Sequence, residues 1–161
     1  MDGVQIHRVR VADGLRWAAL LSADELARAA RFRFQVDHDR FVAGRGATRW
    51  LVAQALGTDP RALSFGDGPH GKPFVLGAAG FHFNRSHSGD WVLVATSRLG
   101  EVGADVELAR PDLDVLELGR TVLTAPELGA LSSLSGEARQ AAFYRVWARK
   151  EAVLKAWGIG L

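Results

Sequence analysis

The stretch that decides the fold is VGADVEL, residues 102–108, in which apolar residues alternate with two acids. In a β-strand successive side chains point to opposite faces, so the apolar residues would lie on one face and Asp105 and Glu107 on the other. Neighbouring carboxylates repel each other, so either water screens them, one acid is protonated, or a cation lies between them. The stretch therefore predicts either the solvated face of a half-buried strand or a cation site.

The residues before this stretch predict further β-structure. Strand composition on both sides of a turn at Gly89 is found in FHFNRSHSGDWVLVATS, residues 81–97. Apolar and basic residues alternate in IHRVRV, residues 6–11, as expected of a first strand with one buried face. GDGPHGKP, residues 66–73, has the composition of a turn.

Four regions predict helices. Ser22 and Glu25 form a capping-box pattern near the start of residues 21–34, in which apolar residues recur with helical periodicity. A second helix is expected over residues 39–56, with Gly57 as its stop. Residues 113–134 predict one or two helices broken near Pro126, and residues 143–157 predict a strong closing helix.

Composition excludes several classes of protein. The 161 residues are enough to bury a core, and no apolar run approaches the roughly 20 residues of a membrane helix. The absence of cysteine excludes disulfides and thiolate sites, and a cytoplasmic protein is expected. Most of the basic residues are arginine without a basic run, so neither a nucleic acid nor a membrane is expected as a partner.

The closing helix carries a third acid. Trp147, Glu151 and Lys155 are spaced i, i+4, i+8 and therefore share one face of the helix. Taken alone, Glu151 and Lys155 would be a solvent-facing ion pair that stabilises the helix by about 0.2–0.5 kcal/mol. Together with Asp105 and Glu107, however, Glu151 would complete an oxygen donor set that suits magnesium, with manganese as an alternative.

Two turns could hold an anion. Ser86, His87 and Ser88 lie beside Gly89 at the end of a predicted strand, where hydroxyl, imidazole and backbone N–H groups suit phosphate. Lys72 lies in the other turn, and without a phosphate opposite it would be an ordinary surface lysine.

The order of these motifs resembles a known family. GKP at residues 71–73, FNRSHS at 83–88, GADVE at 103–107 and WARKEAVLKAWGIGL at 147–161 resemble the 4′-phosphopantetheinyl transferases of the surfactin-synthetase type. The resemblance spans nearly the whole chain. It implies an α+β fold built as a pseudo-twofold pair of α/β halves, residues 1–102 and 103–161, of which the second is expected to be incomplete because members of the family continue with further strands.

The resemblance also implies roles for individual residues. Asp105, Glu107 and Glu151 match the family's magnesium ligands, and Lys155 matches the lysine that meets the pyrophosphate of coenzyme A. Glu151 and Lys155 are the expected catalytic residues, with Glu151 as general base. The residues expected to hold coenzyme A and its phosphates are Arg28, Lys72, Ser86, His87 and Lys155.

The implied reaction moves 4′-phosphopantetheine from coenzyme A to a serine of an apo acyl or peptidyl carrier protein, as used in fatty acid, polyketide and nonribosomal peptide synthesis. Arg85 departs from the family's usual apolar residue between Asn and Ser, and Ala148 from the usual Ser or Thr. The alternative is a non-catalytic module that binds coenzyme A or a carrier protein.

The carrier protein is expected to dock on the segment between GADVE and the last helix, where more apolar side chains occur than one buried helix face requires: Leu113, Val115, Leu116, Leu118, Val122 and Leu123. Arg110 and Arg120 would flank this segment and attract an acidic partner. The alternative interpretation, that these apolar side chains form core, has equal weight.

Overall fold

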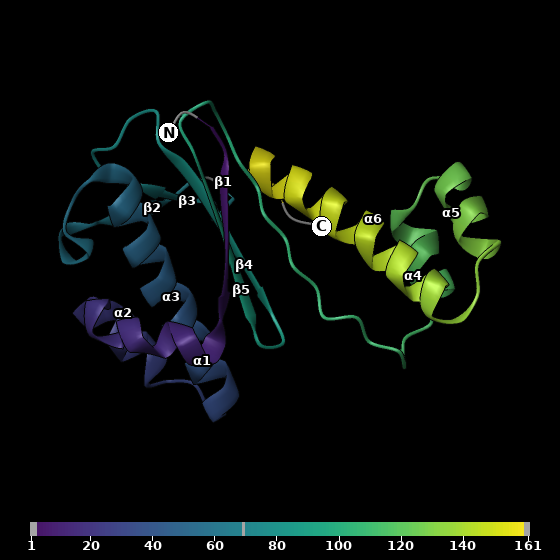
Figure 1. The fold of residues 1–161 in the computed structure, drawn as a ribbon, viewed down its shortest axis with the longest axis horizontal. Helices are drawn as coiled ribbons and strands as arrows, with labels where there is room; N and C mark the ends of the chain where they lie inside the picture. Colours follow the sequence, from purple (N-terminus) through teal and green to yellow (C-terminus); the bar gives the residue numbers. More distant parts are fainter. Residues whose placement is uncertain (1–2, 69, 160–161) are drawn as a thin grey trace.

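The computed structural model describes residues 3–68 and 70–159, and it has the α+β class that the sequence predicts (Figure 1). A small antiparallel sheet stands at the centre, with the N-terminal helices on one side and the C-terminal helices on the other. No helix in these residues is both long enough and apolar enough to cross a lipid bilayer.

The central sheet has three strands in the order β1-β5-β4, namely Gln5–Arg10, Trp91–Ser97 and His82–Ser88. β4 and β5 form the hairpin predicted around Gly89, in which Asn84 pairs with Ala95 and Ser86 with Leu93. A separate hairpin joins β2, Phe65–Asp67, to β3, Pro73–Val75, across the predicted turn.

One face of the sheet packs on the long helix α3, Gln35–Leu56. Val92 and Val94 are buried against Ala43 of α3, and Phe83 joins a second cluster with Val52. Helix α3 begins four residues before the predicted start and ends at Gly57, whose left-handed φ of 69° closes the helix as expected.

Short elements complete this side of the molecule. Helix α2, Ala23–Ala29, begins at the predicted capping box of Ser22 and Glu25 but ends before residue 34, the predicted end of the helical segment. The remaining elements are α1, Val11–Gly14, and the 3₁₀ turns η1, Leu15–Leu20, and η2, Pro60–Ala62.

The prediction of a strand at VGADVEL is wrong, because residues 101–110 are extended but form no β-ladder. The segment lies over the second face of the sheet, where Val102 and Ala104 pack against Leu93 and Ala95. Side chains of β4 hold it: Asn84 accepts from the N–H of Ala104 at 3.1 Å. A segment that crosses the face of a sheet cannot use the backbone groups that a strand at the edge would pair.

Three helices follow. Helix α4, Val115–Val122, and helix α5, Ala125–Ser132, are the two predicted helices, with Pro126 in the first turn of α5. Helix α6, Gly136–Trp157, begins seven residues before its predicted start and runs from α4 and α5 back to the sheet (Figure 1).

The apolar side chains proposed for carrier docking mostly form core. Val115 is buried with Leu131 and Phe143, and Leu116, Val122 and Leu123 pack against that cluster. Leu118 is exposed. The α4 segment therefore offers much less apolar surface than its sequence suggests.

Candidate active site

The odd-numbered residues of the segment 101–108 face the last turns of α6. Gly103 makes the closest approach, because a Cβ atom there would lie 1.8 Å from the carbonyl oxygen of Ala152 and 2.4 Å from the nitrogen of Ala156. Only glycine fits so close to another backbone. Gly103 thus lets α6 lie directly against the segment that carries Asp105 and Glu107.

Asp105 is the most enclosed acid of the candidate site, with its side chain only 2% exposed. Its Oδ1 accepts from Nζ of Lys155 at 2.5 Å and from Oγ of Ser86 at 2.8 Å. Its Oδ2 is buried and has no partner within the described residues. Because an unpaired buried polar atom costs free energy, this oxygen is suited to a ligand.

Glu107 lies farther along the same face. Partial burial raises the pKa of Glu107, and the negative charge of Asp105 raises it further, whereas Trp147 and Ser88 oppose the shift by hydrogen bonding. The two acids are thus close enough to repel, as the sequence predicts.

Glu151 lies on the same stripe of α6, one turn from Trp147 and one turn from Lys155. Since Trp147 contacts Glu107 and Lys155 contacts Asp105, the stripe faces the two acids. Within residues 3–68 and 70–159, however, no three His, Asp or Glu side chains are grouped closely enough to hold one metal ion. The structure brings Asp105, Glu107 and Lys155 together but does not group the three acids.

The expected coenzyme residues divide between the two faces of β4. Ser86 points toward Asp105 and α6. His87, the next residue, belongs to the face that packs on α3. Partial burial and the positive charges of Arg85 and Arg40 lower the pKa of His87, so its imidazole is neutral at pH 7. It would meet a phosphate as a hydrogen-bond donor rather than as a cation.

Arg85 points the same way as His87 and packs on Gly44, where no Cβ is present. Burial and the charge of Arg45 lower the pKa of Arg85 to about 10, while the nearby carboxylate of Glu25 opposes the shift. Arg28 also contributes positive charge to this environment. The sequence marked Arg85 only as a departure from the family, yet it lies in the same arginine-rich region as Arg28.

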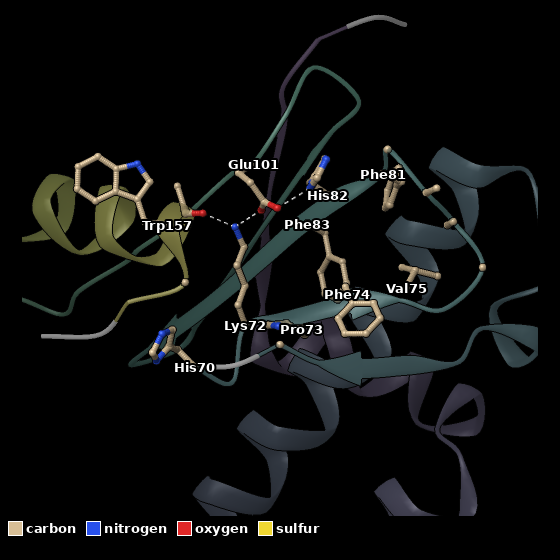
Figure 2. Close-up of a pocket in the computed structure, with 17 residues that line it drawn as sticks. His70, Lys72, Pro73, Phe74, Val75, Phe81, His82, Phe83, Glu101 and Trp157 are labelled. Atoms are coloured by element: carbon tan, nitrogen blue, oxygen red, sulfur yellow. Dashed lines mark hydrogen bonds and ion pairs between the residues drawn. The ribbon is translucent and has the colours of Figure 1, made fainter.

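Lys72 lies apart from both groups. Its ammonium donates to the carbonyl oxygen of Ala156 at 2.5 Å and pairs with Glu101, whose other oxygen lies 3.1 Å from Nδ1 of His82 (Figure 2). These residues border an open groove of about 930 Å³ that also includes Phe74. Neither Glu101 nor His82 was identified from the sequence, because neither belongs to a motif that signals chemistry.

Comparisons with known proteins point to one family. Residues 12–99 match the family model described as "4′-phosphopantetheinyl transferase, N-terminal", and residues 101–161 match the model of the 4′-phosphopantetheinyl transferase superfamily. Together the two models cover almost the entire chain.

Individual relatives of the chain are also 4′-phosphopantetheinyl transferases. The chain is 40% identical over 147 residues to the 4′-phosphopantetheinyl transferase HetI of Nostoc, covering 89% of this chain and 62% of HetI. It is 31% identical over 146 residues to a 4′-phosphopantetheinyl transferase of Bacillus subtilis, covering 91% of this chain and 64% of that protein. The chain thus spans about three-fifths of the length of such relatives.

Among solved structures, a holo-(acyl-carrier-protein) synthase from Bacillus anthracis in complex with CoA (3′,5′-ADP) aligns with a TM-score of 0.46 and 20% identity. The alignment covers 58% of this chain and 92% of that one.

Proposed function

Because the chain belongs to the 4′-phosphopantetheinyl transferase superfamily, we propose that it acts in the transfer of 4′-phosphopantetheine from coenzyme A to a carrier-protein serine. We further propose that it is of the surfactin-synthetase type, on the order of its GKP, SHS, GADVE and WARKE motifs. Its partner would be an apo acyl or peptidyl carrier protein.

The observation that carries the proposal is the environment of Asp105. Its carboxylate is enclosed, one oxygen is held by Lys155 and Ser86, and the other is buried without a partner in the described part of the chain. The pKa of Glu107 is raised by its partial burial and further by the negative charge of the nearby Asp105. A buried acid with one free oxygen and a like-charged neighbour fits a cation.

The donor chemistry fits magnesium, or manganese in its place, with Asp105, Glu107 and Glu151 as the proposed ligands. When bound, the ion would supply positive charge to the pyrophosphate oxygens of coenzyme A. Gly103 supports this assignment because it allows the helix that carries Glu151 to lie against the segment that carries the other two acids.

For coenzyme A we propose Ser86 and Lys155 at the pyrophosphate, and His87 and Arg28 at the nucleotide phosphates. Lys155 and Ser86 already meet at the Asp105 carboxylate, and their donors are of the kind that bind phosphate oxygens. Two of the three donors of the Lys72 ammonium are already taken by Glu101 and by the carbonyl of Ala156.

In the proposed reaction the serine oxygen of the carrier protein forms a bond to the β-phosphorus of coenzyme A. The bond from that phosphorus to the bridging oxygen breaks, and adenosine 3′,5′-bisphosphate leaves. Glu151 would accept the serine proton as general base, and Lys155 would balance the charge that develops on the phosphate oxygens.

Calorimetric titration of coenzyme A with and without magnesium tests the proposal. We expect magnesium to strengthen binding to the wild type and to have little effect on Asp105→Asn. A wild type that binds coenzyme A equally well with and without magnesium would contradict the metal assignment. Binding without transfer to any carrier protein would instead support the non-catalytic module.

A second titration tests the phosphate assignment. Arg28→Ala and His87→Ala should lose roughly tenfold to hundredfold in affinity for coenzyme A, because a hydrogen bond to a charged group contributes about 1.5–3 kcal/mol. They should bind dephospho-coenzyme A almost as well as the wild type does. Equal losses for both ligands would place these residues away from the 3′-phosphate.

A further inference from the structure

The last turn of α6 is attached to the segment 101–105 at two points, one on each side of Gly103. On one side Lys155 donates to Asp105. On the other side Lys72 pairs with Glu101 and donates to the carbonyl of Ala156, as Figure 2 shows. Residues 101, 103 and 105 share a face of the extended segment. The contacts therefore form a row against the end of α6.

Lys72 acts as a C-terminal cap for α6. The last carbonyls of a helix have no partner within it, and the helix dipole gives them a partial negative charge. The N–H groups of Gly158 and Ile159 return to the carbonyls of Lys155 and Leu154. The carbonyl of Ala156 instead accepts from the ammonium of Lys72, which comes from a turn 84 residues earlier in the chain.

The rest of the network keeps Lys72 in this position. Its side chain is only 14% exposed, and its Cβ lies 3.6 Å from the place that a Cβ of Gly158 would occupy. Glu101 accepts from Lys72 with one oxygen and faces His82 with the other. Two of the three donors of the ammonium are thus taken by a carboxylate and a carbonyl of the fold itself.

We propose that Lys72 is a positioning residue: it fixes the last turn of α6 on the 101–105 segment, so that Lys155 keeps its contact with Asp105 and the stripe of α6 that carries Glu151 continues to face the two acids. In this role its ammonium is held by the fold rather than by a phosphate of coenzyme A. The kinetic consequence of this inference rests on the proposed function, whereas its structural part does not.

Backbone amide hydrogen exchange tests the structural part. Lys72→Met keeps the length of the side chain but removes its charge and donors, so exchange at residues 157–159 should accelerate roughly tenfold through local opening. Lys72→Arg should restore slow exchange. Arg98→Met is the matched control, because Arg98 donates to the carbonyl of Ala55 at the end of α3 and its loss should affect only that helix.

Steady-state kinetics test the consequence for transfer. Lys72→Met should lower kcat about tenfold, leave the KM for coenzyme A unchanged, and keep the preference for coenzyme A over dephospho-coenzyme A. Glu101→Gln should change kcat in the same direction by a smaller factor. A phosphate-binding Lys72 predicts the opposite pattern: a raised KM in Lys72→Met, and a lowered KM in Glu101→Gln because the lysine is released.

Unchanged exchange in Lys72→Met would overturn the inference, as would a raised KM with unchanged kcat. If Lys72→Met does not fold, Glu101→Gln and Lys72→Arg decide between the two roles by the direction of their KM. A wild type that binds no coenzyme A would refute the proposed function, and the exchange experiment would still decide whether Lys72 holds α6.

Discussion

The two faces of the central sheet differ in what covers them and in how they are held. The face toward α3 carries most of the large buried apolar side chains, among them Val92, Val94 and Phe83, with Arg85 and His87 farther along β4. The opposite face is covered by an extended segment and α6, and polar side chains such as Asn84 and Ser86 hold that cover.

This difference separates the main source of stability from the proposed metal site. Burial of large apolar side chains supplies most of the folding free energy, and the α3 face concentrates them. The other face leaves a carboxylate oxygen of Asp105 buried with no partner among residues 3–68 and 70–159 and places like charges together, both of which cost stability. Such features are typical of functional sites.

The largest effect should come from the α3 face. Phe83→Ala should lower the free energy of unfolding by roughly 3–5 kcal/mol, because it empties a fully buried position. Ser86→Ala, three residues along on the opposite face, should cost only about 1 kcal/mol. Chemical denaturation of both variants checks this, and equal losses would contradict the division between the faces.

Gly103→Ala should push α6 away from the extended segment 101–108. The new Cβ would overlap the backbone of Ala152, so α6 must move, at a cost of roughly 1–3 kcal/mol. We expect transfer to be lost, since Lys155 would leave Asp105. Gly129→Ala on α5, where a Cβ meets nothing within 4 Å, should hold or raise thermal stability.

Glu107→Gln should show that the acid pair costs stability. The folded pKa of Glu107 is raised, so its ionisation destabilises the fold as pH rises above the ordinary value of 4.5, and this cost is absent at lower pH. The variant should therefore be more stable than the wild type at pH 7, by about 0.2–1 kcal/mol for so accessible a group, and equal at pH 4. Thermal melts at both pH values measure this, and a less stable variant at pH 7 would indicate that Glu107 is a favourable partner.

The smallest effect should come from a surface outside both faces. Arg120 is exposed on α4 beside Glu117, and together with Leu118 and Arg110 it belongs to the exposed part of the proposed carrier-docking surface. Arg120→Glu should raise the KM for carrier protein by less than about fivefold and reduce its salt dependence, with coenzyme A binding unchanged. Arg8→Glu on β1, at the other edge of the sheet, is the control, and equal effects of the two variants would remove α4 from the docking surface.

The sequence by itself determined the features that depend on near neighbours. The cap of Ser22 and Glu25, the stop at Gly57 and the hairpin around Gly89 each involve residues close in the chain, and all three were predicted. Family membership was equally accessible, because it rests on the order of short motifs. The bounds of α3 and α6 were less accurate, because their first turns carry weak apolar periodicity.

Only the tertiary structure decided what covers each face. Alternation along VGADVEL predicted that Asp105 and Glu107 share a face, but it could not show that the segment crosses a sheet instead of joining it. The contact of Gly103 with Ala152 and the cap that Lys72 places on α6 join residues far apart in the chain. A sequence pattern records which side chains point the same way, whereas their partners are fixed by packing of distant segments, and that packing determines which acids and lysines meet.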